Sequence, residues 1–285
     1  MATKSRTSGL SESMRLCLDE VRMHDHDRFL TLLFAPAGKR PALIALYAFN
    51  LEIARIAETV SEPMMGHIRL QWWRETLEGL PRGETRGHAA AVALHEADAF
   101  PAGALAGLAD ARERDLSEDV FEDMSALESY AEATSSSVMR LAAQAIDEEK
   151  AEAAGEAIRH AGIAYALTGL LRALPLHASQ GWLMLPADLL LERNVDPHDV
   201  LAGRMNEALR GAILDVASRA RAHLTSARAA SYNAALLPAL LPASLCDRYL
   251  DLVMAPGFDP FKTPVEVPAF RRQLRLMGRS IAKRI

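Results

Sequence analysis

Cysteine is scarce in this chain of 285 residues. Only Cys17 and Cys246 occur, far apart and without a neighbouring histidine. This scarcity excludes a disulfide framework and the closely spaced ligands of a zinc site. Aromatic residues make up only 6% of the chain, so the core must consist mainly of aliphatic side chains.

Long apolar runs and a basic surplus are also missing. The longest apolar candidate, 234–246, is interrupted by Pro238 and Pro242 and falls short of the roughly 18 residues that a bilayer span needs. Lys4 and Arg6 are not followed by an apolar segment, so no signal peptide is expected. A net charge of −5 argues against a nucleic-acid partner. We therefore expect a cytoplasmic protein.

Helical patterns fill most of the chain, in which half of the residues are apolar. An apolar stripe recurs at steps of three and four, which is typical of one face of a helix. It comprises Leu46, Phe49, Ile53, Ile56 and Val60. No alternating strand pattern is found. The sequence predicts one all-α domain over 1–285, with residues 1–24 loosely ordered.

The segment 268–285 is predicted to be a basic amphipathic helix. Its apolar stripe consists of Phe270, Leu274, Met277, Ile281 and Ile285. Six cationic residues and no acidic residue accompany the stripe, namely Arg271, Arg272, Arg275, Arg279, Lys283 and Arg284. Such a helix suits an anionic membrane surface or an acidic partner, and the first four of these arginines are the candidate contacts. This interpretation places the protein peripherally at the inner membrane. The alternative is that the stripe packs on the domain.

Three stretches of the chain carry recognisable motifs. Residues 45–55 read ALYAFNLEIAR, residues 68–74 read IRLQWWR, and residues 167–186 read LTGLLRALPLHASQGWLMLP. Together they resemble the squalene/phytoene synthase family. The resemblance implies an all-α fold of the isoprenoid synthase type, which is a helical bundle around a central cavity.

Active members of that family hold Mg²⁺ on two aspartate-rich motifs, because carboxylate oxygens suit a hard cation that bridges diphosphate oxygens. The matching positions in this chain are Ala54, Arg55 and Glu58 in the first motif, and Ala173 and His177 in the second. An arginine about 6 Å from Mg²⁺ would cost on the order of 5 kcal/mol at an effective dielectric near 20. Pro175 is expected to end or kink the helix within the second motif. Both metal motifs are missing, and we expect no metal or other cofactor.

The same departures are found in a branch of this family that resembles a respiratory complex I assembly factor. This resemblance implies a non-catalytic protein that assists assembly of a membrane complex. Its partners would be subunits of the complex, other assembly proteins or a bound lipid. The alternative is an active head-to-head prenyl transferase that uses prenyl diphosphates and Mg²⁺ with altered ligands. The lost carboxylates favour the non-enzyme interpretation.

Seven residues are candidates for lining the cavity, where an isoprenoid or an anionic lipid is the candidate ligand. They are Tyr47, Asn50, Arg55, Glu58, Tyr165, Arg172 and His177. Arg55 could bind an anionic head group without metal, or it could form a helical ion pair with Glu52 or Glu58. Arg172 lies in an apolar run and needs a partner when buried, for which Glu58 is a candidate.

Two further features have competing interpretations. Trp72 and Trp73 are adjacent, so we expect one in the core and the other exposed as a candidate partner contact. The segment 24–27 alternates His and Asp. Alternate positions do not converge on one helical face, so a helix cap is favoured there over a metal site.

Overall fold

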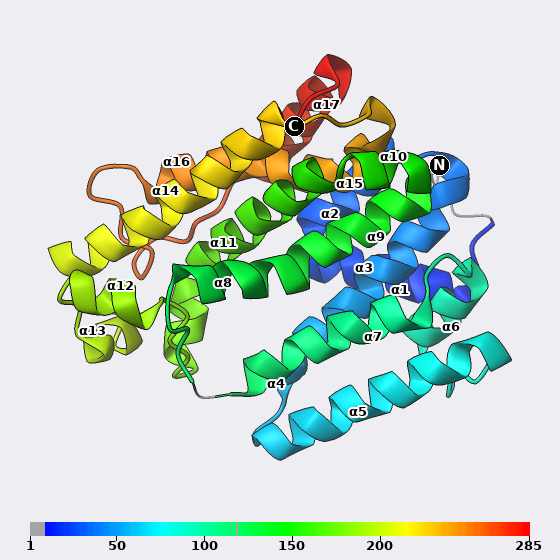
Figure 1. Ribbon diagram of the computed structural model, residues 1–285, viewed down its shortest axis with the longest axis horizontal. Helices are drawn as coiled ribbons and strands as arrows, with labels where there is room; N and C mark the ends of the chain where they lie inside the picture. The colour runs from blue at the N-terminus through cyan, green and yellow to red at the C-terminus, as the bar shows by residue number, and fades with distance from the viewer. Residues whose placement is uncertain (1–8, 118) are drawn as a thin grey trace, which may run out of the picture. The chain divides into compact units, whose positions relative to one another are not determined.

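The computed structural model describes residues 9–117 and 119–285, and within these ranges the chain is helical, with no strand (Figure 1). This confirms the predicted all-α class. The chain divides into two compact units. Unit 1 comprises Met1–Ser117 and Leu141–Glu148, and unit 2 comprises Glu118–Arg140 and Glu149–Ile285. The single domain and the central cavity stay predictions.

Unit 1 is built on three helices that pack against one another, α1, α3 and α6, while α5 packs on α7. Of the predicted stripe, Leu46, Phe49, Ile53 and Ile56 are buried. The α-helices of unit 1 are α1 (Glu12–His24), α2 (His26–Thr31), α3 (Arg40–Ala54), α4 (Ile56–Thr59), α5 (Pro63–Gly79), α6 (Ala89–Ala97) and α7 (Ala102–Ala111).

Helix α1 corrects the expectation that residues 1–24 are loosely ordered, although residues 1–8 lie outside the described ranges. Ser11 caps the helix by accepting a hydrogen bond from the Met14 amide at 3.1 Å. Met14, Cys17 and Val21 are buried because their spacing of three and four puts them on one face. Asp25 then caps α2 by accepting from the Arg28 amide, as the favoured interpretation of segment 24–27 predicts.

Unit 2 centres on the two longest helices, α11 and α14, which lie alongside each other (Figure 1). Helix α8 leads into a π-helical turn over Glu132–Ser136 that packs on α11. The remaining helices are α8 (Met124–Ala131), α9 (Ser137–Ile146, shared between the units), α10 (Glu148–Ala153), α11 (Gly155–Ser179), α12 (Ala187–Glu192), α13 (Pro197–Leu201), α14 (Glu207–Ala229), α15 (Leu237–Leu240), α16 (Cys246–Val253) and α17 (Ala269–Ala282).

Two positions on α11 show how tightly this helix is packed. At Gly162 an added Cβ would lie 2.3 Å from the Cα of Ser136, so only glycine fits against the π-helical turn. Further along, α11 continues past Pro175 to Ser179, so the proline does not end the helix, while the expected alternative of a kink stays a prediction. Proline removes one backbone hydrogen bond, and the burial of Leu171, Leu174 and Ala178 offsets that loss.

The two cysteines are buried and free. Burial, followed by the charges of nearby glutamates, raises the pKa of the Cys17 thiol to about 12. The side chain of Cys17 therefore stays protonated at neutral pH and acts as a small apolar group in the core of unit 1.

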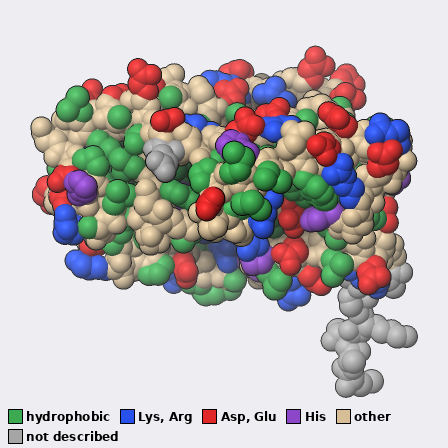
Figure 2. Space-filling view, turned by 90° about the horizontal axis from the view of Figure 1, so that it is seen from below, with side chains coloured by type: hydrophobic (Ala, Val, Ile, Leu, Met, Phe, Trp, Pro, Cys, Tyr) green, Lys and Arg blue, Asp and Glu red, His purple; other side chains and the backbone are tan. Residues whose placement is uncertain are grey.

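The surface mixes both signs of charge. On the face drawn in Figure 2, acidic and basic side chains are interspersed with apolar ones. None of the helices in the described part of the chain combines the length and the apolar character that a membrane span requires.

Candidate functional site

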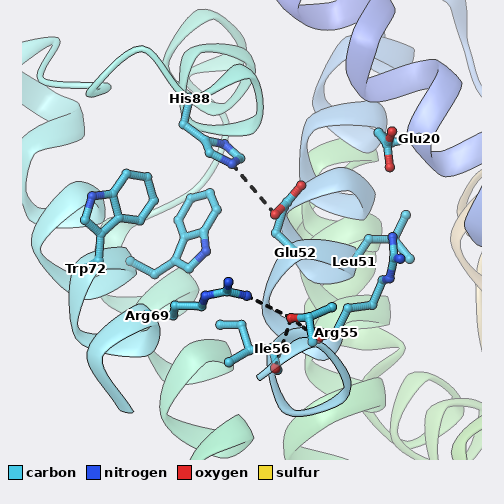
Figure 3. Close-up of a pocket in the computed structure, with 10 residues that line it drawn as sticks. Glu20, Leu51, Glu52, Arg55, Ile56, Arg69, Trp72 and His88 are labelled. Atoms are coloured by element: carbon cyan, nitrogen blue, oxygen red, sulfur yellow. Dashed lines mark hydrogen bonds and ion pairs between the residues drawn. The ribbon is translucent and has the colours of Figure 1, made fainter. Parts of the chain in front are cut away.

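A pocket of about 560 Å³ opens in unit 1 between α1, α3, α4, α5 and the start of α6 (Figure 3). Its volume lies in the range of small-molecule sites. It is lined by Glu20, Leu51, Glu52, Arg55, Ile56, Thr59, Arg69, Trp72, Trp73 and His88.

One wall of the pocket comes from the junction of α3 and α4. The Arg55 amide donates to the Leu51 carbonyl at 3.1 Å, and the Thr59 amide donates to the Arg55 carbonyl at 3.1 Å. The helix is interrupted at Arg55, which belongs to neither α3 nor α4, but Glu52, Arg55 and Thr59 all line the pocket. Ala54 and Glu58 are not among the lining residues.

Arg69 defines the basic end of the pocket. Arg69 Nη1 donates to the Thr59 hydroxyl at 2.8 Å, and this hydroxyl donates to the Arg55 carbonyl at 2.9 Å. These bonds join the exposed Arg69 to the backbone of the half-buried Arg55, whereas the Arg55 side chain points away from Arg69, toward Leu51 (Figure 3). A guanidinium group can bind an anionic group without a metal ion.

The opposite end carries His88 and Glu52. His88 Nε2 lies 3.7 Å from Glu52 Oε2. His88 Nδ1 accepts a hydrogen bond from the Ala90 amide at 3.3 Å and caps α6. Because Nδ1 is the acceptor, the proton of the neutral ring lies on Nε2, which faces the carboxylate.

The aromatic wall corrects one expectation about the tryptophans. Trp73 is buried against Phe49, with ring centroids 5.0 Å apart, as expected for a core residue. Trp72 is half-buried and lines the same pocket, so it is less exposed than expected, and its role as a partner contact stays a prediction. The His88 ring packs edge-on against both indole rings, with centroid distances of 5.6 Å to Trp72 and 4.9 Å to Trp73. Both tryptophans therefore contact the same histidine.

The positions that match the two metal motifs do not form a magnesium site. Ala54 and Ala173 offer only methyl groups, Arg55 carries a positive charge, and Glu58 is exposed. The half-buried His177 ring lies 6.0 Å from that of Trp182. Among residues 9–117 and 119–285, no three His, Cys, Asp or Glu side chains gather as a metal ion would require. This donor set does not fit Mg²⁺, which prefers carboxylate oxygens.

The other predicted cavity residues fall in both units. In unit 1, burial raises the pKa of Tyr47 to about 12, so its hydroxyl stays protonated, and Asn50 is buried with no hydrogen-bond partner for its side-chain oxygen. In unit 2, Tyr165 is half-buried, and the Arg172 guanidinium lies 3.9 Å from the Tyr249 ring centroid. Arg172 therefore has a cation–π partner. Its pairing with Glu58 stays a prediction.

Two of the predicted membrane contacts on α17 are engaged elsewhere. Arg275 and Arg279 pair with Asp247 of α16, which corrects their assignment as free basic contacts. Local spacing could not predict this pairing, because Asp247 lies 28 residues before Arg275 in the chain. Arg271 is exposed and Arg272 is half-buried.

Three of the lining residues, Glu20, Arg69 and His88, were not among the predicted site residues. Arg69 could have been found, because its spacing of three from Trp72 puts both on one side of α5. Glu20 and His88 belong to segments that only the packing of α1, α3 and α6 brings together.

Comparison with known proteins supports one family. The squalene/phytoene synthase profile matches residues 21–276. The chain is 31% identical over 278 residues to NADH dehydrogenase (ubiquinone) complex I, assembly factor 6, of Bos taurus, a match that covers 96% of this chain and 82% of that protein. It is 27% identical to presqualene diphosphate synthase of Sinorhizobium fredii, over 84% of this chain and 87% of that enzyme.

A dehydrosqualene synthase crystallised with a ligand has the same fold. Its TM-score is 0.82 at 16% identity, and the match covers 95% of this chain and 96% of that one. The fold is therefore that of the isoprenoid synthases, as the motifs imply. The profile match spans most of the chain, and the protein belongs to the squalene/phytoene synthase family.

Proposed function

We propose that the protein is a non-catalytic member of its family and assists assembly of the respiratory NADH dehydrogenase, complex I. The match to the assembly factor of Bos taurus, over nearly the whole of this chain, carries the proposal. Its partners would be subunits of the complex or other assembly proteins, and its place of action the cytoplasmic side of the inner membrane.

Deletion of the gene in the organism that encodes the chain tests the assembly role. We expect less assembled complex I on native gels and lower NADH–ubiquinone activity, with both restored by the wild-type gene. Succinate–ubiquinone activity is the control and should stay unchanged. A deletion strain with normal complex I would contradict the proposal.

The lack of catalysis is supported by the side chains at the motif positions. Ionisation of an allylic diphosphate depends on metal ions that stabilise the leaving group. Ala54, Arg55 and Ala173 supply no carboxylate for them. We expect no presqualene, squalene or phytoene product from farnesyl or geranylgeranyl diphosphate with Mg²⁺. Turnover above a heat-killed control would favour the alternative, an active prenyl transferase with altered ligands.

The pocket supports a second role, the binding of an anionic amphiphile such as an isoprenoid diphosphate or an acidic lipid. Arg55 or Arg69 would hold the charged group, while Trp72, Trp73 and Ile56 would contact the apolar part. Because the charge is met by guanidinium groups, binding should not depend on Mg²⁺.

Calorimetric titration with farnesyl diphosphate, with and without Mg²⁺, tests this role. The double variant Arg55→Ala, Arg69→Ala should bind at least about tenfold more weakly, a change of about 1.4 kcal/mol. Arg86→Ala is the matched control, because Arg86 packs on Trp72 at 5.7 Å but does not line the pocket. Equal affinity of the wild type and the double variant would exclude the head-group role. Arg172→Ala, measured alone, tests whether that arginine contributes.

A further inference from the structure

Helix α17 attaches to unit 2 through its polar side. It packs on the 3-10 segment Leu241–Leu245, and Leu276 is the buried residue within the helix. Arg275 Nε donates to the Ser244 carbonyl at 2.5 Å. The inward side of this amphipathic helix is therefore made by arginines around one leucine.

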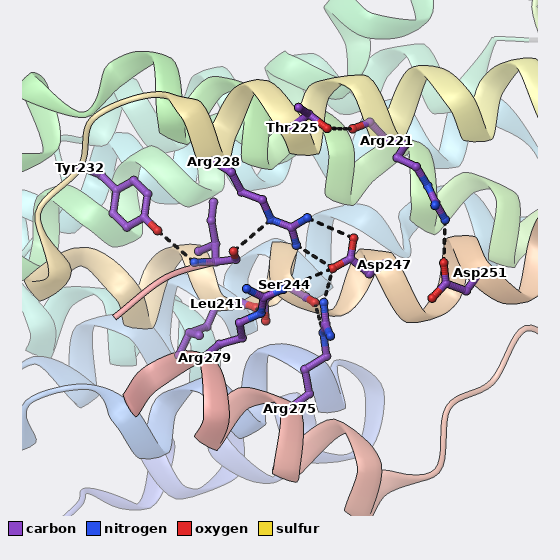
Figure 4. Close-up of polar contacts among 11 residues, drawn as sticks. Arg221, Thr225, Arg228, Tyr232, Leu241, Ser244, Asp247, Asp251, Arg275 and Arg279 are labelled. Carbon is purple, nitrogen blue, oxygen red and sulfur yellow. Dashed lines mark hydrogen bonds and ion pairs between the residues drawn. The ribbon is translucent and has the colours of Figure 1, made fainter. Parts of the chain in front are cut away.

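A single carboxylate holds that side in place (Figure 4). Asp247 accepts from Arg228 at 2.6 Å, pairs with Arg275, and lies 3.6 Å from Arg279. These four residues form the Asp247 cluster, which joins α14, α16 and α17. Arg275 bonds both Asp247 and the Ser244 carbonyl, and Arg279 pairs with the same carboxylate one turn later, so these two contacts fix the rotation of α17 about its axis.

The end of the chain is also held. Lys283 has a positive φ of 54° and ends the helix. Arg228 Nε donates to the Ile285 carbonyl at 3.0 Å, and the Ile285 amide donates to the Tyr232 hydroxyl at 2.9 Å. The Ile285 side chain is buried. With both the Asp247 cluster and Ile285 in place, α17 presents one defined side to solvent.

That side is apolar. Phe270 is 58% exposed, Leu274 63%, Met277 51% and Ile281 80%. These four residues, at steps of four, three and four, form the α17 outer face. The exposed cations Arg271, Lys283 and Arg284 lie near its two ends. A surface helix of a globular protein normally has the opposite orientation, with its apolar stripe packed on the core.

We propose that the α17 outer face binds an anionic lipid leaflet, with the helix lying in the plane of the membrane surface. Protruding apolar side chains between exposed cations are the pattern of an interfacial helix. Charge favours an anionic membrane over a second copy of this chain as the binding partner of this face. Residues 270–285 hold six cations and no acid, so the helices of two copies would repel each other, whereas an anionic surface attracts them. The proposal does not depend on the role in complex I assembly.

The Asp247 cluster determines which cations reach the lipid. Arg275 and Arg279 are paired inside the molecule, so Arg271, Lys283 and Arg284 supply the attraction. Each cation near an anionic leaflet contributes about 1 kcal/mol, which corresponds to about a fivefold change in partition coefficient. Salt should weaken this attraction, because the three charges are exposed.

Flotation of the full-length protein with lipid vesicles tests the proposal. The vesicles are phosphatidylcholine alone, or phosphatidylcholine with about a third phosphatidylglycerol, at low and high salt. We expect binding to the anionic vesicles at low salt, weaker binding at high salt, and little binding to the neutral vesicles. Leu274→Gln with Ile281→Gln should lower the partition coefficient at least about tenfold, and so should Arg271→Gln with Lys283→Gln and Arg284→Gln.

Leu191→Gln is the matched control, because Leu191 on α12 is 79% exposed and lies outside α17. It should float like the wild type. All of the substituted side chains are exposed, so thermal unfolding followed by circular dichroism should be unchanged. Flotation of the Leu274, Ile281 variant like the wild type, or no binding of the wild type, would overturn the proposal. A dimer in light scattering that this variant converts to a monomer would assign the face to a second copy instead.

Discussion

Two apolar stripes have the same helical spacing in this protein, but one is buried and the other is exposed to solvent. In α3 and α4, Leu46, Phe49, Ile53 and Ile56 are buried among the helices of unit 1. In α17, the outer face points to solvent. Periodicity therefore identifies a face of a helix, but it does not reveal what covers that face.

The difference arises from the residues beside each stripe. Helix α3 is apolar on most sides, with Leu43, Ala45 and Tyr47 also buried, so it can lie only inside the unit. Helix α17 carries arginines that Asp247 and the Ser244 carbonyl can bind. Pairing these cations with a partly buried carboxylate satisfies charges and turns the apolar stripe outward.

Phenylalanine truncation should separate the two stripes most clearly. Phe49→Ala removes a fully buried ring that packs on Trp73, so we expect a loss of about 3–5 kcal/mol in the free energy of unfolding. Phe270→Ala removes an exposed ring and should change stability by at most about 0.5 kcal/mol. Urea unfolding measures both. Similar losses in the two variants would mean that α17 packs its stripe inward.

Replacing a glycine by alanine should also have opposite effects in the buried helix α11 and in the exposed helix α17. Gly162→Ala would force a Cβ against the backbone of Ser136, which should destabilise unit 2 by about 1–3 kcal/mol. Gly278→Ala on α17 meets no atom within 4 Å and should stabilise by about 0.5–1 kcal/mol, because alanine favours helix. Thermal melts of the two variants should shift in opposite directions. A lower melting temperature for Gly278→Ala would show that α17 is covered.

Asp247→Asn should release α17 from unit 2. The loss should be about 2 kcal/mol, less than for a fully buried pair because Asp247 is partly exposed. Hydrogen exchange of the α17 amides at neutral pH measures the release. Unchanged protection in the variant would show that Leu276 and Ile285 hold the helix without the cluster.

The wild type should show the same release in acid. Burial alone would raise the pKa of Asp247, but Arg228, Arg275 and Arg279 outweigh it and hold the pKa below its ordinary value. The stabilisation is therefore complete above the unfolded pKa of about 4 and is lost as the pH falls through the lower folded pKa. Protection of α17 should decrease in that acidic range.

The smallest expected effect on stability comes from a pair of histidines in unit 2. His160 Nδ1 and His223 Nδ1 lie 2.8 Å apart between α11 and α14, and His223 Nε2 lies 3.0 Å from Glu128. Burial, and then the charge of His223, lowers the pKa of His160. A lowered pKa favours the neutral ring in the folded state, so stability should be complete above about pH 6.5 and decrease as the pH falls.

A His160→Gln variant should lose less stability than the wild type between pH 7 and pH 5, by less than about 1 kcal/mol. Urea midpoints at the two pH values measure the difference. His198→Gln is the control, because His198 is exposed on α13, whereas the pair lies on α11 and α14. An identical pH dependence of the wild type and His160→Gln would show that the pair does not titrate against folding.

Local features of the chain were sufficient for much of this description. Periodicity predicts the all-α class, the buried stripe of α3 and the amphipathic helix at the C-terminus. The resemblance to the squalene/phytoene synthase family implies, from the residues at 54, 55, 173 and 177, that both metal motifs are lost. The helical predictions depend only on side-chain chemistry and on helix geometry, which act within a few residues, whereas the loss of the motifs depends on the resemblance to the family.

The tertiary structure alone decided the rest. Glu20, Arg69 and His88 line one pocket, and both tryptophans line it as well. Helix α11 continues past Pro175. Arg275 and Arg279 pair with Asp247, so the stripe of α17 points outward. Each outcome depends on a partner far away in the chain, and local spacing cannot specify which distant group will satisfy a charge or cover an apolar face.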